Sequence, residues 1–145
     1  MINMSISPYL HFNGNCAEAV ELYKKAFSAK VLRITQYKDL PQSEGYEFPA
    51  GTENFVMNGE IQIGDSTIML ADCPPEHPTT FSDGINIHVY LNAKEDIETA
   101  FNTLADSGQV TMPLEKTFWS ESFGMVTDKF GVCWMLSMPM QHSFN

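Results

Sequence analysis

The chain has 145 residues, of which 43% are hydrophobic, and this is enough to fill the core of one domain. Eighteen acidic residues against eight basic ones give a formal net charge of −10, which would repel a phosphate backbone and excludes nucleic acid as an expected partner. No apolar run has the length of a membrane span, and the amino terminus lacks the basic region and apolar stretch of a signal peptide, so we expect one soluble, cytoplasmic domain over residues 1–145 with no membrane partner.

The first half, about residues 1–73, carries the pattern of a strand, a helix and three further strands. A short strand is predicted at 6–12 and an amphipathic helix at 15–28, with apolar residues at helical spacing. Asn15 and Glu18 are spaced as a capping box at the start of this helix. Strand-like runs follow at 30–37, 55–63 and 67–71.

The second half, about residues 84–139, repeats this order. The strand at 85–91 alternates Ile87, Val89 and Leu91 with the polar side chains of Asn86, His88 and Tyr90. A helix is predicted at 93–107, with Asn92 and Glu95 as a second capping box and Gly108 as a left-handed stop. Strands are predicted at 109–117, 123–127 and 132–138. Duplication of one module therefore explains the length, and His11 and His88 occupy near-equivalent strand positions.

Two segments interrupt the repeat, and three cysteines are spread over the chain. Residues 39–54 and 73–84 are rich in Pro, Gly, Ser and acidic residues, which indicates a flap and a linker between the halves. Cys16, Cys73 and Cys133 are an odd number at wide spacing, without a metal-finger pattern. We interpret them as reduced, mostly buried thiols.

Three stretches carry a resemblance to a known family: PYLHFNGNCAEAVELYKKAF at 8–27, EIQIGDSTIMLAD at 60–72 and TFWSESFGMVTDKFGVCWM at 117–135. Together they resemble the PhnB-like branch of the vicinal oxygen chelate superfamily, which includes glyoxalase I, bleomycin-resistance proteins, extradiol dioxygenases and fosfomycin-resistance transferases. The resemblance implies an α+β fold of two βαβββ modules, with a mixed sheet curled into a cup, the helices outside, and commonly a homodimer. In the catalytic families a divalent metal in the cup binds bidentate oxygen substrates.

Two departures from the catalytic pattern bear on this metal. The position where the resemblance implies a metal-binding Glu after DKFG holds Met135, whose soft thioether is a poor ligand for a hard divalent ion. Asn58 stands where PhnB-like relatives often carry His. The remaining candidate ligand set is His11, Glu60 and His88, which would resemble a facial triad.

Three functions from different classes stay open at this stage, and one of them, a structural or regulatory dimer without a ligand, would require the cup to be filled by its own side chains. Another is a small-molecule binding protein of the bleomycin-resistance type, whose ligand would contact a set of polar and aromatic side chains: His11, Asn58, Asn86, His88, Tyr90 and Trp119. The third is a divalent-metal-dependent lyase, isomerase, dioxygenase or transferase, in which Glu60 would move a proton. Trp119, with Phe118 and Phe123, could line the ligand site, although such aromatic residues more often belong to the core. Some relatives carry names that suggest methyl transfer, but no segment resembles a glycine-rich nucleoside-binding site.

Overall fold

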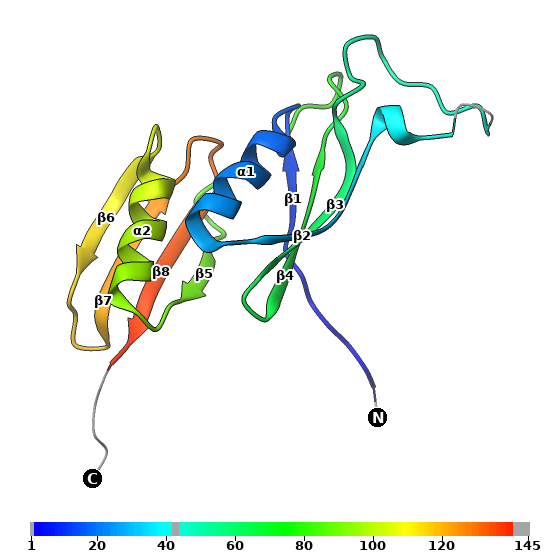
Figure 1. Cartoon of the computed structure of the whole chain (residues 1–145). Helices are drawn as coiled ribbons and strands as arrows, with labels where there is room; N and C mark the ends of the chain where they lie inside the picture. The colour runs from blue at the N-terminus through cyan, green and yellow to red at the C-terminus, as the bar shows by residue number, and fades with distance from the viewer. Residues whose placement is uncertain (1, 42–43, 141–145) are drawn as a thin grey trace. The chain divides into compact units, whose positions relative to one another are not determined.

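The computed structural model describes residues 2–41 and 44–140 (Figure 1). The chain divides into two compact units. The first holds the chain up to residue 24 and residues 28–79, and the second holds residues 25–27 and the chain from residue 80. The boundary at residues 79 and 80 falls inside the predicted linker.

The first unit follows the predicted order of elements. It contains β1 (Tyr9–Phe12), most of α1 (Cys16–Phe27), β2 (Lys30–Gln36), the 3₁₀ helix η1 (Tyr37–Asp39), β3 (Val56–Ile63) and β4 (Ser66–Asp72). The strands form one mixed sheet in the order β1-β4-β3-β2, with β1 parallel to β4 and the other pairs antiparallel.

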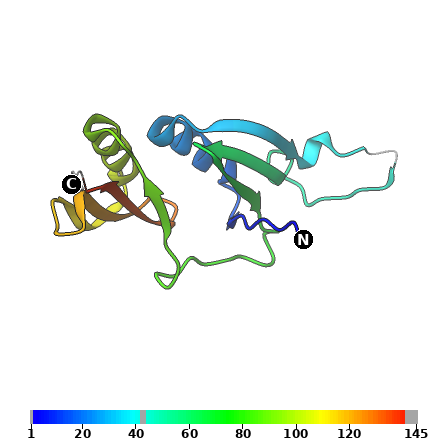
Figure 2. The same cartoon turned by 90° about the horizontal axis from the view of Figure 1, so that it is seen from below.

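The second unit repeats this topology. It contains β5 (Ile87–Tyr90), α2 (Lys94–Ala105), β6 (Gln109–Glu115), β7 (Ser120–Thr127) and β8 (Cys133–Pro139). The sheet order is β5-β8-β7-β6, again with a single parallel pair, β5 with β8. α2 packs on β6, β7 and β8, and Figure 2 shows it across one face of that sheet. The predicted α+β fold with a βαβββ order in each half is confirmed.

Each sheet has one buried face and one open face, because successive side chains of a strand point to opposite sides. In the first unit the buried face is apolar and includes Leu10, Phe12, Ile61 and Leu70. In the second unit the face under α2 includes Gly124, Val126, Trp134 and Leu136. We call the opposite sides the first open face, which carries Tyr9, His11, Asn58, Glu60 and Met69, and the second open face, which carries His88, Tyr90, Met125, Met135 and Ser137.

The predicted capping box at α1 is wrong, because the helix start is capped from another strand. Asn15 is the N-cap residue but makes no side-chain capping bond. Instead, Oδ1 of Asp72 accepts hydrogen bonds from the backbone N–H groups of Gly14 (2.8 Å) and Cys16 (3.0 Å), and Oδ2 accepts one from Val56 (2.8 Å). One buried carboxylate therefore fixes the β1–α1 junction and the start of β3.

The predicted ends of α2 also need correction. Its N-cap residue is Ala93, and no side chain caps the helix, so the box of Asn92 and Glu95 does not form. The left-handed residue after α2 is Ser107, with φ of 58°, and Gly108 is not in that region. Gly108 is required by close approach instead, since a Cβ there would meet the carbonyl oxygen of Thr127.

The family-specific segment DKFGVCW forms a structural turn. Oδ1 of Asp128 accepts hydrogen bonds from the N–H groups of Phe130 (2.9 Å) and Val132 (3.1 Å), and Oδ2 accepts one from Nε1 of Trp134 (2.9 Å). Gly131 in this turn has φ of 98°, a conformation that favours glycine. Asp128 and Trp134 are both buried, so this signature encodes the connection between β7 and β8.

The three cysteines are free thiols with different environments. Cys16 is fully buried, whereas Cys73 and Cys133 are half-buried, so the prediction of mostly buried thiols is correct for Cys16 alone. Burial, and to a lesser extent the Asp72 carboxylate, raises the pKa of the Cys16 thiol to about 12. Cys16 is therefore a protonated core residue rather than a nucleophile.

Candidate functional site

A polar cluster occupies the first open face. Tyr9 lies opposite Met69, Met69 lies opposite Glu60, and Glu60 lies opposite Arg33, so the cluster crosses all four strands. Asn58 follows two residues before Glu60 on β3 and therefore points to the same side. We call Tyr9, Arg33, Asn58 and Glu60 the Arg33 cluster.

Hydrogen bonds join the Arg33 cluster into one network. Arg33 donates from Nε to Oδ1 of Asn58 (2.7 Å) and from Nη1 to Oε1 of Glu60 (2.7 Å). Asn58 in turn donates from Nδ2 to the phenol oxygen of Tyr9 (3.2 Å). The guanidinium thus orients a carboxylate and an amide that would otherwise rotate freely.

Stacked rings extend the first open face beyond the network. The phenol of Tyr9 and the imidazole of His11 lie with centroids 4.7 Å apart and planes 13° apart. Both residues are exposed, and Leu10 and Phe12 point to the buried side. The register of β1 therefore places His11 on the open face.

Sequence reasoning missed Arg33, and a bulge in β2 explains why. Val31 pairs with Ile61 on the buried side, and Arg33 pairs with Glu60 on the open side, so Leu32 is an extra residue between them. Strict alternation would have put Arg33 on the same side as Val31. A signal was present in the composition, because Arg33 is the only arginine in the sequence.

The second open face brings together His88, Tyr90 and Ser137. Nε2 of His88 lies 2.8 Å from Oγ of Ser137, and its ring meets that of Tyr90 edge-on at a centroid distance of 4.2 Å. Burial lowers the pKa of His88, which favours the neutral imidazole. Met135, at the position where catalytic relatives are expected to hold a Glu ligand, lies directly opposite His88. Asn86 lies just before β5 and two residues before His88, which is the spacing of side chains on the same side of a strand.

Trp119 is not a core residue, which corrects the interpretation that favoured the core for such aromatics. Its side chain lies in the β6–β7 connection and is 52% exposed, while Phe118 is 86% exposed. Phe118 packs edge-on against Trp119 at 4.7 Å, and Trp119 against the buried Phe123 at 5.6 Å. The connection therefore presents an exposed aromatic surface.

The strand registers refine the equivalence between the histidines. Gly59 and Gly124 each lie opposite a leucine, Leu70 and Leu136. Counted from these glycines, the residue that corresponds to His88 is Tyr9, since both lie opposite a methionine. His11 and His88 therefore lie on the open faces of their own sheets, but His11 is two residues beyond Tyr9, the position that corresponds to His88.

The residues of the first open face do not fit a divalent metal. The only carboxylate of the Arg33 cluster, Glu60, already binds a guanidinium, and the Asn58 amide oxygen binds the same group. A metal ion there would have to displace a positive charge of fixed geometry. Among the described residues, no group of three or more His, Cys, Asp or Glu side chains has a metal-binding arrangement. The ligand set of His11, Glu60 and His88 spans both units and stays a prediction.

The fold shows the general class of protein to which the chain belongs. Two mixed four-stranded sheets of βαβββ topology are characteristic of glyoxalase-like proteins, and the solved glyoxylase/bleomycin resistance protein/dioxygenase domain from Frankia sp. EAN1pec is similar, with a TM-score of 0.66 over 97% of this chain and 100% of that one. At 10% identity this likeness concerns the fold alone. No helix in the described part of the chain is long and apolar enough to cross a membrane.

The family follows from closer matches. A family model described as 3-demethylubiquinone-9 3-methyltransferase matches residues 4–137, and the chain belongs to this family, a PhnB-like branch of the vicinal oxygen chelate superfamily. Protein YjdN of Escherichia coli is 32% identical, over 95% of this chain and 97% of that one. The activity in the family's description does not by itself assign a reaction to this chain, because the residues of the site decide.

Two solved structures support the same assignment. Protein PA1353 from Pseudomonas aeruginosa has a TM-score of 0.82 at 36% identity, covering 94% of this chain and 98% of that one. A PhnB protein from Bacillus cereus, described as a 3-demethylubiquinone-9 3-methyltransferase, has a TM-score of 0.78 at 29% identity, covering 93% and 99%.

Proposed function

We propose that the protein binds a small, planar, partly aromatic molecule on its first open face, without a metal ion. The observation that carries this proposal is the Arg33 cluster, in which a guanidinium orients Asn58 and Glu60 beside the exposed Tyr9–His11 stack. A flat pair of rings offers a stacking surface, and the oriented amide and carboxylate offer hydrogen bonds at its edge.

Stability alone does not account for this arrangement. The side chains of Arg33 and Glu60 are 46% and 23% exposed, and ion pairs at such positions contribute on the order of 0–1 kcal/mol to folding. An apolar or fully solvated strand face would serve folding as well. Orientation of a ligand is a use that does require fixed polar groups.

On the second open face we propose a further set of ligand contacts. Asn86, His88 and Tyr90 share one side of the chain around β5, and the neutral imidazole of His88 can donate or accept a hydrogen bond. Trp119 adds an exposed aromatic ring. Glu60 remains the residue that we would expect to accept a proton if the protein also catalyses a reaction, and its ion pair with Arg33 fixes the position of its carboxylate.

The test is a ligand screen with matched variants. A library of small aromatic amides, phenols and carboxylates is screened by saturation-transfer NMR on protein treated with a chelator, and the affinity of each hit is measured by isothermal titration calorimetry. We expect Arg33→Met to weaken binding at least about tenfold, as expected for loss of charge-assisted hydrogen bonds, and Lys25→Met, an exposed lysine on α1, to leave it unchanged.

Two outcomes would overturn the proposal. One is the absence of any hit that saturates in the metal-free protein. The other is equal affinity for wild type and Arg33→Met, which would show that the ligand binds elsewhere. If binding appears only after addition of Zn²⁺, Mn²⁺ or Ni²⁺ and is lost in His11→Ala and His88→Ala, the metal-dependent alternative replaces this proposal.

The family resemblance also leads us to propose that both units belong to one domain and that the protein is a cytoplasmic homodimer. Sedimentation equilibrium tests the oligomeric state. A homodimer gives twice the chain mass of 16.3 kDa, and a single-chain mass at micromolar concentration would contradict it.

A further inference from the structure

A groove lies in the second unit, on the side of its sheet that faces α2. It has a volume of about 650 Å³ and is formed by the first turn of α2, the end of β6, and β7 and β8. Ser122 lines it, and the next residue, Phe123, belongs to the open face. This groove is therefore separate from the open faces described above.

Packing explains why the groove is there. At Gly124 a Cβ would come within 2.7 Å of the Phe101 ring and 2.9 Å of Leu114, so α2 is in direct contact with β7 at this point. Ser122, two residues earlier on the same side, lines the groove together with Lys94 of the first turn of α2. The volume is within the range of ligand pockets.

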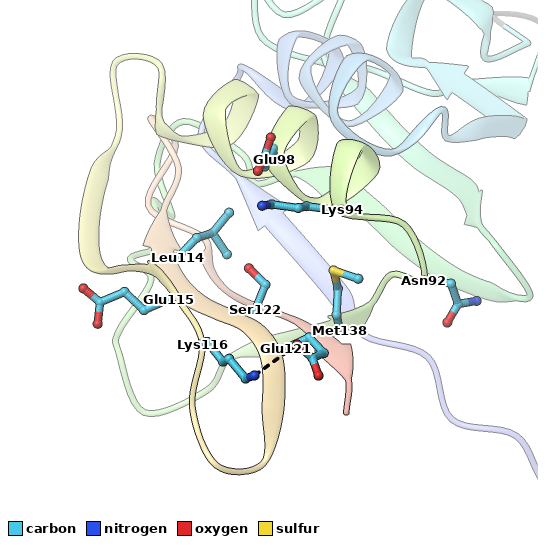
Figure 3. Close-up of a pocket in the computed structure, with 9 residues that line it drawn as sticks. All are labelled: Asn92, Lys94, Glu98, Leu114, Glu115, Lys116, Glu121, Ser122 and Met138. Atoms are coloured by element: carbon cyan, nitrogen blue, oxygen red, sulfur yellow. Dashed lines mark ion pairs between the residues drawn. The ribbon is translucent and has the colours of Figure 1, made fainter. Parts of the chain in front are cut away.

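Lys94 occupies a position of α2 at which the helical pattern predicts an apolar residue. The buried stripe of α2 consists of Ile97, Ala100, Phe101 and Leu104. Lys94 lies three residues before Ile97 and seven before Phe101, so it continues this stripe toward the groove. Figure 3 shows Lys94, Leu114 and Ser122 pointing toward one another from α2, β6 and β7, whereas Glu115 points away.

Two lysines and three glutamates line the groove: Lys94, Lys116, Glu98, Glu115 and Glu121. Lys116 and Glu121, at its edge, form an ion pair at 3.7 Å. Within residues 2–41 and 44–140, Lys94 makes no ion pair. An ammonium and the hydroxyl of Ser122 thus converge above the apolar side chains of Leu114 and Met138.

We propose that this groove binds a small aliphatic monocarboxylate, with its carboxylate on Lys94 and Ser122 and its hydrocarbon chain on Leu114 and Met138. An ammonium and a hydroxyl are both donors to a carboxylate. The apolar floor selects a hydrocarbon chain over a polar one.

The test is a titration of the isotope-labelled protein with hexanoate, in which binding is measured from the amide chemical shifts. We expect saturable shifts in α2, β6 and β7, at least about tenfold weaker binding in Lys94→Met because a charge-assisted contact is lost, and unchanged binding in Lys129→Met, an exposed lysine of the same unit. Hexanol, which has the chain without the charge, should bind at least about tenfold more weakly than hexanoate. Ser122→Ala should weaken hexanoate binding in the same direction.

Several results would overturn the inference. They are no saturable shifts in wild type, equal affinity for hexanoate and hexanol, or unchanged affinity in Lys94→Met. Should Lys94→Met fail to fold, the shift map and the comparison of hexanoate with hexanol in wild type still decide. Shifts confined to the Arg33 cluster would also refute this groove. The open-face proposal is tested with other ligands and another variant, so the two proposals fail separately.

Discussion

Asp72 holds the first unit together through backbone hydrogen bonds, and removing its carboxylate should destabilise the protein strongly. Three N–H groups, those of Gly14, Cys16 and Val56, donate to it. A hydrogen bond to a charged group contributes about 1.5–3 kcal/mol, and bonds that share one acceptor are not additive, so we expect Asp72→Ala to cost about 4–6 kcal/mol. In urea unfolding followed by far-UV circular dichroism, a slope of about 2 kcal/mol per M converts this into a midpoint lower by about 2–3 M.

Asp72→Asn distinguishes the contributions of the two carboxylate oxygens to stability. The amide keeps an oxygen for Gly14 and Cys16 but presents an N–H₂ group to the N–H of Val56, so about 2 kcal/mol should be lost. Asp65→Asn in the exposed β3–β4 turn is the control and should change stability by less than about 0.5 kcal/mol. A midpoint for Asp72→Ala within about 0.5 M of wild type would refute the role given to this carboxylate.

Three further predictions concern the core and the second open face. The Cys16 thiol, with its pKa raised to about 12, keeps its proton when folded but loses it near its ordinary value of 9 when unfolded. Its contribution to stability is therefore complete below pH 9 and is lost as the pH rises toward 12. The free energy of unfolding should be lower by about 1.4 kcal/mol at pH 10. Urea unfolding at pH 8 and at pH 10 should show this loss in Cys73→Ala, which keeps the Cys16 thiol, but not in Cys16→Ala. Gly124→Ala should cost about 1–3 kcal/mol by overpacking α2 against β7. Gly84→Ala, whose Cβ would meet the Ser82 hydroxyl at an ordinary contact distance of 3.8 Å, should not; equal unfolding midpoints would contradict this. His88, with its pKa lowered by burial, contributes stability that is present above pH 6.5 and is lost as the pH falls through its folded pKa; an NMR titration that places this pKa at or above 6.5 would contradict the prediction.

The elements of the fold could be predicted from the sequence because their hydrophobic periods are regular. The alternation of Ile87 and Val89 with His88 and Tyr90, and the helical spacing of Ile97, Phe101 and Leu104, correspond to β5 and α2. The caps could not be predicted, since Asp72, the acceptor at the start of α1, is 56 residues away in the sequence from Cys16. Local spacing such as Asn15 with Glu18 does not contain that information.

The candidate site was only partly accessible for a similar reason. Asn58 and Glu60 share one face of β3, as the simple alternation of a strand predicts. Arg33 could not be placed, because the extra residue Leu32 reverses the side to which it points. Trp119 could not be separated from core aromatics, since exposure depends on what surrounds the β6–β7 connection.

The measurement that tests the central claim most directly is an NMR map of a screening hit bound to chelator-treated protein. The indole N–H of Trp134, which is buried and donates to Asp128, gives an internal control. We predict that amide signals around Arg33 and Asn58 shift on binding and that the Trp134 indole signal stays in place. A hit that binds without moving the signals around Arg33 would contradict the assignment of the first open face as a ligand site.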